Sequence, residues 1–200
     1  MSIPFQDSET AKNLLRAFAG ESQARNRYDF AANLCQKQEL QAMAFIFQAT
    51  AKQEQAHAKV FWDHLQALNG QNLPIYGAYP IEGTNRILEL LRAAQHNEHE
   101  EHGSVYPSFA AIATQEGFPE AAASFRQIAA IEQLHGERFG LLADQLESGA
   151  LFVSQIETGW MCLNCGHTQN SLEAPKQCPV CNHGQGWFIR LELAPWSPVV

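Results

Sequence analysis

Two short motifs decide the fold of this chain: Glu54-Gln-Ala-His57 and Glu132-Gln-Leu-His135. Each motif places a Glu and a His three residues apart, so that in a helix both side chains lie on one face. Two such helices, joined by Glu residues from two further helices, build the carboxylate-bridged two-metal site of some helical bundles. A single Glu-x-x-His is common by chance, so the residues around each motif decide whether it is predicted to hold metal.

Both motifs lie within stripes that repeat in steps of three and four residues, the pattern of an inward helix face. The stripe around the first motif consists of Phe47, Thr50, Glu54, His57, Phe61, His64 and Leu68. The stripe around the second motif consists of Phe125, Ile128, Glu132, His135, Phe139, Leu142 and Leu146. A lone Glu on a helix usually faces water, but an unpaired carboxylate in an apolar stripe is costly. We therefore predict that bound metal neutralises these Glu residues.

A helix before the first motif supplies a further carboxylate. It is predicted to run from an N-cap at Ser8 to about Cys35. Its stripe is predicted to consist of Leu14, Phe18, Glu21, Arg25, Tyr28 and Ala32. Tyr28 follows Glu21 by two turns, where it either hydrogen-bonds a metal ligand or fills the core. Cys35 is interpreted as a small buried residue.

The third predicted helix extends from about Thr84 to Gln115, and Pro107 is expected to kink it. Its inner side is predicted to consist of Ile87, Leu91, Ala94, Glu98, Glu101, Val105 and Ile112. The remaining members of the same cluster, which the inner side cannot all accommodate, are assigned to the solvated flank: His96, His99, Glu100 and His102.

The chain contains an internal repeat. Glu21 precedes Glu54 by 33 residues, and Glu98 precedes Glu132 by 34 residues. Two helical hairpins that each give one Glu and one Glu-x-x-His predict a pseudo-twofold site. Glu101 has no counterpart in the first hairpin, so it is an extra carboxylate.

The segments between the predicted helices indicate how each helix runs relative to the next. A short break near residues 38–40 separates the first two helices, and the second continues to about Leu68. Residues 69–83 contain two Pro and three Gly, and this length suits a crossover along the bundle. The fourth helix is predicted to begin at Pro119 and to end near Ser148.

A second, smaller unit follows the helices. Cys162-Leu-Asn-Cys165 and Cys178-Pro-Val-Cys181, twelve residues apart, predict four thiolates around one metal, with zinc and a single iron both open. Gly, Pro and aromatic residues dominate this unit, so short strands and turns are expected there. Such a small unit also needs the metal to fold. The predicted division is a bundle over 1–148, a linker over 149–159 and a cysteine domain over 160–200.

Composition excludes several classes of partner. A formal net charge of −8 argues against binding to nucleic acid or an anionic membrane. We expect no signal peptide and no membrane span, because no apolar run approaches about 18–20 residues. Paired Cys-x-x-Cys motifs favour a reducing compartment, so a cytoplasmic location is predicted.

The chain resembles the rubrerythrin family over nearly its whole length. The resemblance rests on Gly20-Glu-Ser-Gln-Ala-Arg-Asn-Arg-Tyr28, Glu54-x-x-His57, Glu98-x-x-Glu101 with Tyr106-Pro107, Glu132-x-x-His135 and the two cysteine pairs. It implies a mainly α protein: a ferritin-like four-helix bundle with a long crossover and a small C-terminal rubredoxin-like domain.

The resemblance also implies the metal ligands and the activity. The di-iron ligands would be Glu21, Glu54, His57, Glu98, Glu101, Glu132 and His135. The ligands of a rubredoxin-type iron would be Cys162, Cys165, Cys178 and Cys181. The family is linked to reduction of hydrogen peroxide to water, with electrons passing from the one-iron site to the di-iron site.

In such a peroxidase the catalytic residues would be Glu54, His57, Glu101 and Tyr28. By resemblance, Glu101 and His57 exchange as ligands of one iron between oxidation states. The expected electron donor is external, either a rubredoxin or an NAD(P)H-dependent reductase, which makes turnover NADH-linked.

The geometry of long helices predicts the assembly. Helices of about 28–30 residues are about 42–45 Å long, which places the metal pair about 20 Å from either end. The cysteine domain follows the end of the fourth helix, so unless the linker folds it back along the flank, its iron is poorly placed to serve its own metal pair. A head-to-tail homodimer with electron transfer between chains is therefore expected, as in the family.

Three other readings stay open. An iron-handling ferroxidase would share the bundle, but it has no use for the four cysteines. An oxygenase that activates O₂ needs a substrate pocket, which the sequence does not identify. A non-enzymatic scaffold with a structural zinc ribbon would be colourless, whereas an Fe(III)–thiolate site is coloured.

Overall fold

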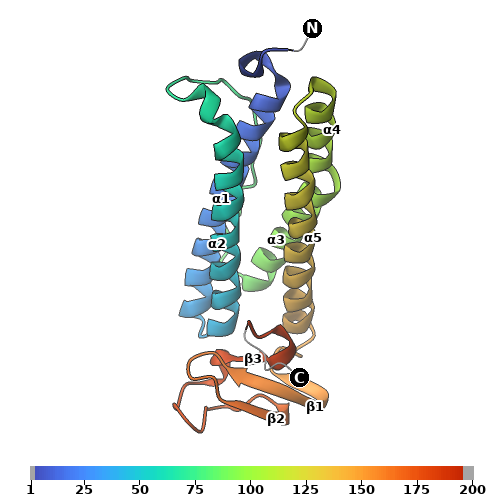
Figure 1. Cartoon of the computed structure of the whole chain (residues 1–200). Helices are drawn as coiled ribbons and strands as arrows, with labels where there is room; N and C mark the ends of the chain where they lie inside the picture. The colour runs from blue at the N-terminus through green and yellow to red at the C-terminus, as the bar shows by residue number, and fades with distance from the viewer. Residues whose placement is uncertain (1–2, 196–200) are drawn as a thin grey trace.

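The computed structural model describes residues 3–195 and shows an antiparallel helical bundle with a small sheet at one end (Figure 1). The helices are α1 (Glu9–Lys37), α2 (Gln41–His64), α3 (Ile87–Glu100), α4 (Tyr106–Glu116) and α5 (Pro119–Glu147). The predicted ferritin-like bundle and small C-terminal domain are thus confirmed. Among the helices of residues 3–195, none combines the length and apolar character needed to cross a membrane.

The first hairpin follows its sequence signals. The Ser8 side chain accepts a hydrogen bond from the Ala11 backbone N–H, which confirms it as the N-cap of α1. Glu116, at the end of α4, accepts the backbone N–H groups of Glu9 and Thr10 and so ties the two helix ends together. A 3₁₀ turn over Leu65–Leu68 extends α2.

The third helical segment differs from the prediction of one helix over 84–115. It begins at Ile87, and a π-helical turn over Glu101–Val105 separates α3 from α4. In this turn the Tyr106 N–H donates to the Glu101 carbonyl, five residues back. Pro107 has no N–H and its ring would clash with the carbonyl four residues earlier, which a wider turn relieves.

Part of the predicted inner stripe of α1 is wrong. Arg25 is exposed and Phe18 is only half-buried, whereas Ala17 and Ala24 are buried. The true stripe steps by three and then four from Leu14, and the Ala residues allow close approach of α2. Leu14, Glu21 and Tyr28, which the two patterns share, are buried as predicted.

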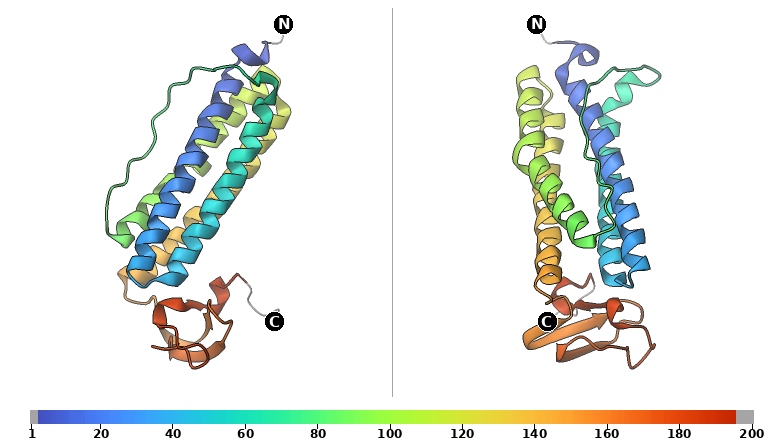
Figure 2. Two further views of the ribbon diagram at one scale, coloured as in Figure 1. Left: turned by 90° about the vertical axis from the view of Figure 1, so that its left-hand side faces the viewer. Right: turned by 180° about the vertical axis from the view of Figure 1, so that it is seen from behind.

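The long connection between α2 and α3 runs along the outside of the bundle, as predicted for a crossover (Figure 2). Its backbone carbonyls at Tyr76 and Pro80 accept hydrogen bonds from Arg16 and Gln23 of α1. Its Glu82 accepts hydrogen bonds from Arg27 of α1 and Asn97 of α3. The crossover is therefore fastened over the side of the bundle where α1 and α3 are neighbours.

The C-terminal unit is an antiparallel sheet in the order β2-β1-β3, with β1 (Val153–Cys162), β2 (Thr168–Glu173) and β3 (Phe188–Arg190). Since β1 begins at Val153, most of the segment predicted as a linker, 149–159, is strand. It pairs with β2, where Val153 lies opposite Glu173. The buried Trp160 anchors the small core.

This sheet is packed against the end of the bundle. Met161 and Ile189 belong to the same apolar cluster as Met43 of α2. Gly186 lies so close to the α1–α2 turn that a Cβ there would be 1.7 Å from the carbonyl oxygen of Glu39. The contact requires Gly at this position and fixes the cysteine unit at the bundle end.

Candidate metal centre

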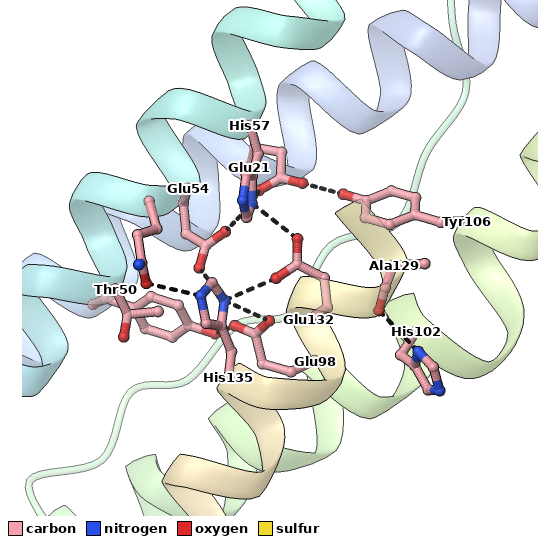
Figure 3. Close-up of polar contacts among 12 residues, drawn as sticks. Glu21, Thr50, Glu54, His57, Glu98, His102, Tyr106, Ala129, Glu132 and His135 are labelled. Atoms are coloured by element: carbon pink, nitrogen blue, oxygen red, sulfur yellow. Dashed lines mark hydrogen bonds and ion pairs between the residues drawn. The ribbon is translucent and has the colours of Figure 1, made fainter. Parts of the chain in front are cut away.

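Six buried side chains from four helical segments converge in the middle of the bundle (Figure 3). These residues are Glu21, Glu54, His57, Glu98, Glu132 and His135. They form two overlapping groups whose ligand atoms lie within 4.8 Å of one another, one around each His. All six were predicted as metal ligands from the sequence.

Glu54 and Glu132 are shared between the two groups. Glu54 places one oxygen 3.1 Å from the Nδ1 of His57 and the other 3.0 Å from the Nδ1 of His135. Glu132 places one oxygen 2.9 Å from the Nδ1 of His57 and the other 2.8 Å from the Nδ1 of His135. Each of these carboxylates therefore faces both positions, which is the arrangement of bridging ligands.

Glu21 and Glu98 each approach only one of the two histidines. An oxygen of Glu21 lies 3.7 Å from the Nδ1 of His57, and an oxygen of Glu98 lies 3.6 Å from the Nδ1 of His135. The centre therefore has the pseudo-twofold symmetry that the repeat predicts.

Unsatisfied polar atoms show that the site suits metal ions. At least one buried oxygen of each of Glu21, Glu54, Glu98 and Glu132 has no partner in the described residues other than the two imidazoles. Such atoms are costly in a protein interior unless a cation coordinates them. Carboxylates and imidazoles from a helical bundle are the donor set of di-iron carboxylate proteins. The residues present therefore fit a two-metal centre.

The protonation of the centre depends on these contacts. Burial lowers the pKa of His57 and His135, but the hydrogen bonds that their imidazoles donate to the carboxylates outweigh it and raise the values to about 12 and about 11. Burial raises the pKa of Glu98 to about 8. Burial opposes ionisation of Glu54 too, yet hydrogen bonds from His135 and His57 lower its pKa to about 2. Without metal, the two imidazoles carry the positive charge that metal ions would supply.

Two tyrosines hold the outer carboxylates. The Tyr28 hydroxyl donates to Glu98, and the Tyr106 hydroxyl donates to Glu21. The Tyr28 contact agrees with its predicted hydrogen bond to a ligand. The role of Tyr106 was missed, although it follows Glu98 by eight residues much as Tyr28 follows Glu21 by seven.

The two histidines differ in their outer contacts. The Nε2 of His135 donates to the side-chain oxygen of Gln53, at 2.9 Å, which leaves Nδ1 free for a metal. Within residues 3–195, no hydrogen bond to the Nε2 of His57 is formed. Gln53 was not predicted, because its side chain is not part of the apolar stripe.

Glu101 lies outside both groups of ligand atoms. It is half-buried at the start of the π-helical turn, and its carboxylate approaches Gly20 of α1. Burial first, and then the nearby carboxylates of Glu98 and Glu132, raise its pKa well above the usual range. His57 therefore lies among the ligand atoms of the centre, whereas Glu101 lies beside them.

The four cysteines come together in the C-terminal unit. The sulfur of Cys162 lies 3.7 Å from that of Cys181, and the sulfur of Cys165 lies 3.6 Å from that of Cys178. A tetrahedral ion with metal–sulfur bonds of about 2.3 Å requires sulfurs roughly 3.8 Å apart. The backbone N–H of His183 donates to the sulfur of Cys181 and lowers its pKa to about 5. The site fits one tetrahedral metal ion.

Comparisons with known proteins agree with both sites. The family model described as "Rubrerythrin" matches residues 12–143, and the model "Rubrerythrin, rubredoxin-like domain" matches residues 160–189. A rubrerythrin from Porphyromonas gingivalis is 44% identical over 188 residues, covering 94% of this chain and 92% of that protein. A rubrerythrin from Nitratidesulfovibrio vulgaris is 40% identical, covering 93% and 96%.

Solved structures support the fold. Nigerythrin in a mixed-valent state is 24% identical, with a TM-score of 0.61, and the match covers 92% of this chain and 90% of that one. A bacterioferritin from Mycobacterium tuberculosis is 18% identical, also with a TM-score of 0.61, over 71% and 88% of the two chains.

Proposed function

The chain belongs to the rubrerythrin family, and from that premise we propose that it is a peroxidase that reduces hydrogen peroxide at the bundle centre. The reaction breaks the O–O bond and consumes two electrons and two protons, giving two molecules of water. Two iron ions bound at the centre would supply the two electrons, one from each ion.

The single observation that carries this proposal is the position of Glu101. Its carboxyl group lies beside the ligand groups without belonging to them, and burial keeps its pKa raised. A protonated carboxyl group at this place can deliver a proton to an oxygen that leaves as water. A centre that only stores iron has no need of an extra acid beside its ligands.

The other proposed catalytic residues have distinct tasks. Glu54 faces both metal positions and would bridge them. His57, which lacks the outer hydrogen bond that His135 has, would be the ligand free to exchange with Glu101. Tyr28 orients Glu98 through its hydroxyl and is a positioning residue.

The four-cysteine site would relay electrons to the bundle from an external donor of the rubredoxin or NAD(P)H-dependent reductase class. Fifteen residues of α5 separate Glu132 from Glu147, and at about 1.5 Å per residue they span about 22 Å. Since the sheet is packed at the bundle end, the four-cysteine site is remote from the metal pair of its own chain. We therefore propose a head-to-tail homodimer in which each cysteine site serves its partner's centre.

Complementation tests the relay and the dimer together. Chains carrying Cys162→Ser are mixed with chains carrying Glu54→Ala and Glu132→Ala, refolded with iron, and the heterodimers are isolated. Each parent should lack NADH-linked peroxide reduction, and the heterodimer should regain about one working site of the two. A verified heterodimer without activity would contradict transfer between chains.

Two further assignments from the sequence stay predictions. They are the division at residues 148 and 160 and the cytoplasmic location. Residues 1–2 and 196–200, which the first and last predicted segments include, lie outside the described residues.

A further inference from the structure

A pocket of about 240 Å³ lies beneath the crossover, on the side of the bundle where α1 and α3 are neighbours. Gly20 of α1, Tyr79 of the crossover, and Glu101 and Tyr106 of the third helical segment line it. Figure 2 shows the crossover running along this side of the bundle. The pocket therefore has one wall made by the crossover and the others made by the bundle.

The inner wall of this pocket is continuous with the metal centre. Tyr106 donates its hydroxyl proton to Glu21, a residue of the centre. Glu101 follows Glu98, a residue of the centre, by three residues in the same helical segment. Gly20 immediately precedes Glu21. A small molecule in the pocket would thus be separated from the ligands by single side chains.

The larger hollow on the outer face of α1 and α2 lacks this connection. Its volume is about 670 Å³, and its lining includes Phe18, Lys52 and Trp62 but none of the six centre residues, Glu101 or Tyr106. Size alone would favour this hollow as a binding site. Contact with the centre favours the pocket beneath the crossover.

Gly20 keeps the pocket open. A Cβ at this position would lie 3.6 Å from a ring carbon of Tyr79 and 4.0 Å from a carboxylate oxygen of Glu101, which are ordinary contacts. Neither contact forbids Ala, and Gly inside a helix is less favourable than Ala. The helix itself therefore gives no reason for Gly, and having Gly here leaves the space between Tyr79 and Glu101 free. A branched side chain would fill that space.

Tyr79 is held in place as the opposite wall. Its hydroxyl donates to the backbone carbonyl of Arg16, at 3.0 Å. On the other side it lies against Gly77, where a Cβ would come within 2.9 Å of the Tyr79 hydroxyl oxygen. Both contacts hold the hydroxyl end of the ring, so the fold sets the position of this wall.

We propose that this pocket is the entry route and binding site for a small oxidant, and that Gly20 and Tyr79 limit the size of molecule admitted. The identity of the oxidant as a hydroperoxide rests on the proposed function, whereas the route does not. Hydrogen peroxide fits the space that Gly20 leaves, and a branched alkyl hydroperoxide would meet the Tyr79 ring.

The test uses the iron-loaded chain with Gly20→Ala, Gly20→Val and Tyr79→Ala. The matched control is Ala56→Val, which changes a residue next to His57 that lines the outer hollow. Azide is the probe of access, and its association rate with the oxidised centre is followed by difference absorption. Turnover is measured separately with hydrogen peroxide and tert-butyl hydroperoxide, and iron content is measured for every variant.

Gly20→Val should slow azide association and lower kcat/KM for hydrogen peroxide, each about tenfold, because added methyl groups overfill the space. Gly20→Ala should give a smaller change in the same direction, and Tyr79→Ala should raise kcat/KM for tert-butyl hydroperoxide. Unchanged azide association in both Gly20 variants, or equal slowing in Ala56→Val, would overturn the route. Wild-type protein without peroxide turnover would refute the peroxidase proposal, and azide would still test the route.

Discussion

The hydroxyl group of Tyr106 on α4 donates a hydrogen bond to Glu21 on α1, across the middle of the bundle. The reverse contact joins Tyr28 on α1 to Glu98 on α3. The two contacts cross, so each helical segment carries both a ligand and the residue that orients the other segment's ligand. The extra residue between Glu98 and Tyr106 is accommodated by the π-helical turn that begins at Glu101.

Tyr106→Phe is expected to weaken metal binding without abolishing it. Loss of an outer contact to a ligand typically lowers metal affinity by about 10–100-fold, and we expect the lower end because five other centre ligands remain unchanged. Competition with a chelator measures the affinity. Tyr76→Phe, in the exposed part of the crossover, is the control and should bind metal normally. Equal affinity in both variants would contradict an orienting role for Tyr106.

Glu101→Ala should retain two bundle irons yet reduce peroxide at least roughly tenfold more slowly, since a positioned acid contributes about 10²–10⁴-fold. Iron content and single-turnover kinetics check the two parts. Glu89→Ala removes an exposed carboxylate of the same helical segment, outside the pocket, and should leave both unchanged. Complete loss of bundle iron in Glu101→Ala would instead make Glu101 a structural ligand.

The metal-free chain should become less stable as the pH rises from 5 to 9. Burial raises the pKa of Glu98 from 4.5 to about 8, so its contribution is complete below pH 4.5 and is lost as the pH rises through 8. The contributions of His57 and His135 are complete below about pH 6.5 and are lost only as the pH approaches 12 and 11.

Thermal unfolding of metal-free protein at pH 5, 7 and 9 measures this dependence. Glu98→Gln should flatten the decline between pH 5 and 8, because that carboxyl group no longer titrates. An increase in melting temperature over this range in the unaltered chain would contradict the pKa directions.

Metal binding at pH 7 should release at least two protons per bundle, one from each imidazole. Both histidines are protonated in the metal-free centre, because their pKa values lie far above 7. Since the coordinating nitrogen must lose its proton, binding tightens as the pH rises. Calorimetry in buffers of different ionisation enthalpy counts the protons. Binding without proton release would mean that the imidazoles are neutral before metal arrives.

Cys162→Ser with Cys178→Ser should remove the visible Fe(III)–thiolate colour and NADH-linked turnover while the bundle keeps its helices. Absorption and circular dichroism measure the two effects. Cys35→Ala removes a buried thiol that lies in the bundle core, and it should keep the colour. Full NADH-linked activity in the colourless variant would exclude the relay role.

The sequence predicts the centre well because its ligands obey helical spacing. Glu54 with His57, and Glu132 with His135, lie three residues apart in apolar stripes, and the repeat pairs them with Glu21 and Glu98. The structure brings all six together as expected. The four cysteines were equally predictable, because their spacing alone defines a knuckle pair.

Features that depend on contacts between distant segments were not predictable. A π-helical turn before Pro107 begins at Glu101, which lies outside the ligand groups, and no local sequence signal distinguishes such a turn from a kink. The strand that begins at Val153 forms because β2 pairs with it. Gln53 reaches His135 on another helix, which its neighbours in sequence do not reveal.

An anaerobic titration of the fully reduced, iron-loaded chain with hydrogen peroxide, followed by Mössbauer spectroscopy, tests the central claim most directly. The account predicts about three irons per chain and oxidation of both bundle irons by one equivalent of peroxide, much faster than by O₂. Faster oxidation by O₂, with iron accumulating beyond the three sites, would contradict it and identify an iron-handling ferroxidase.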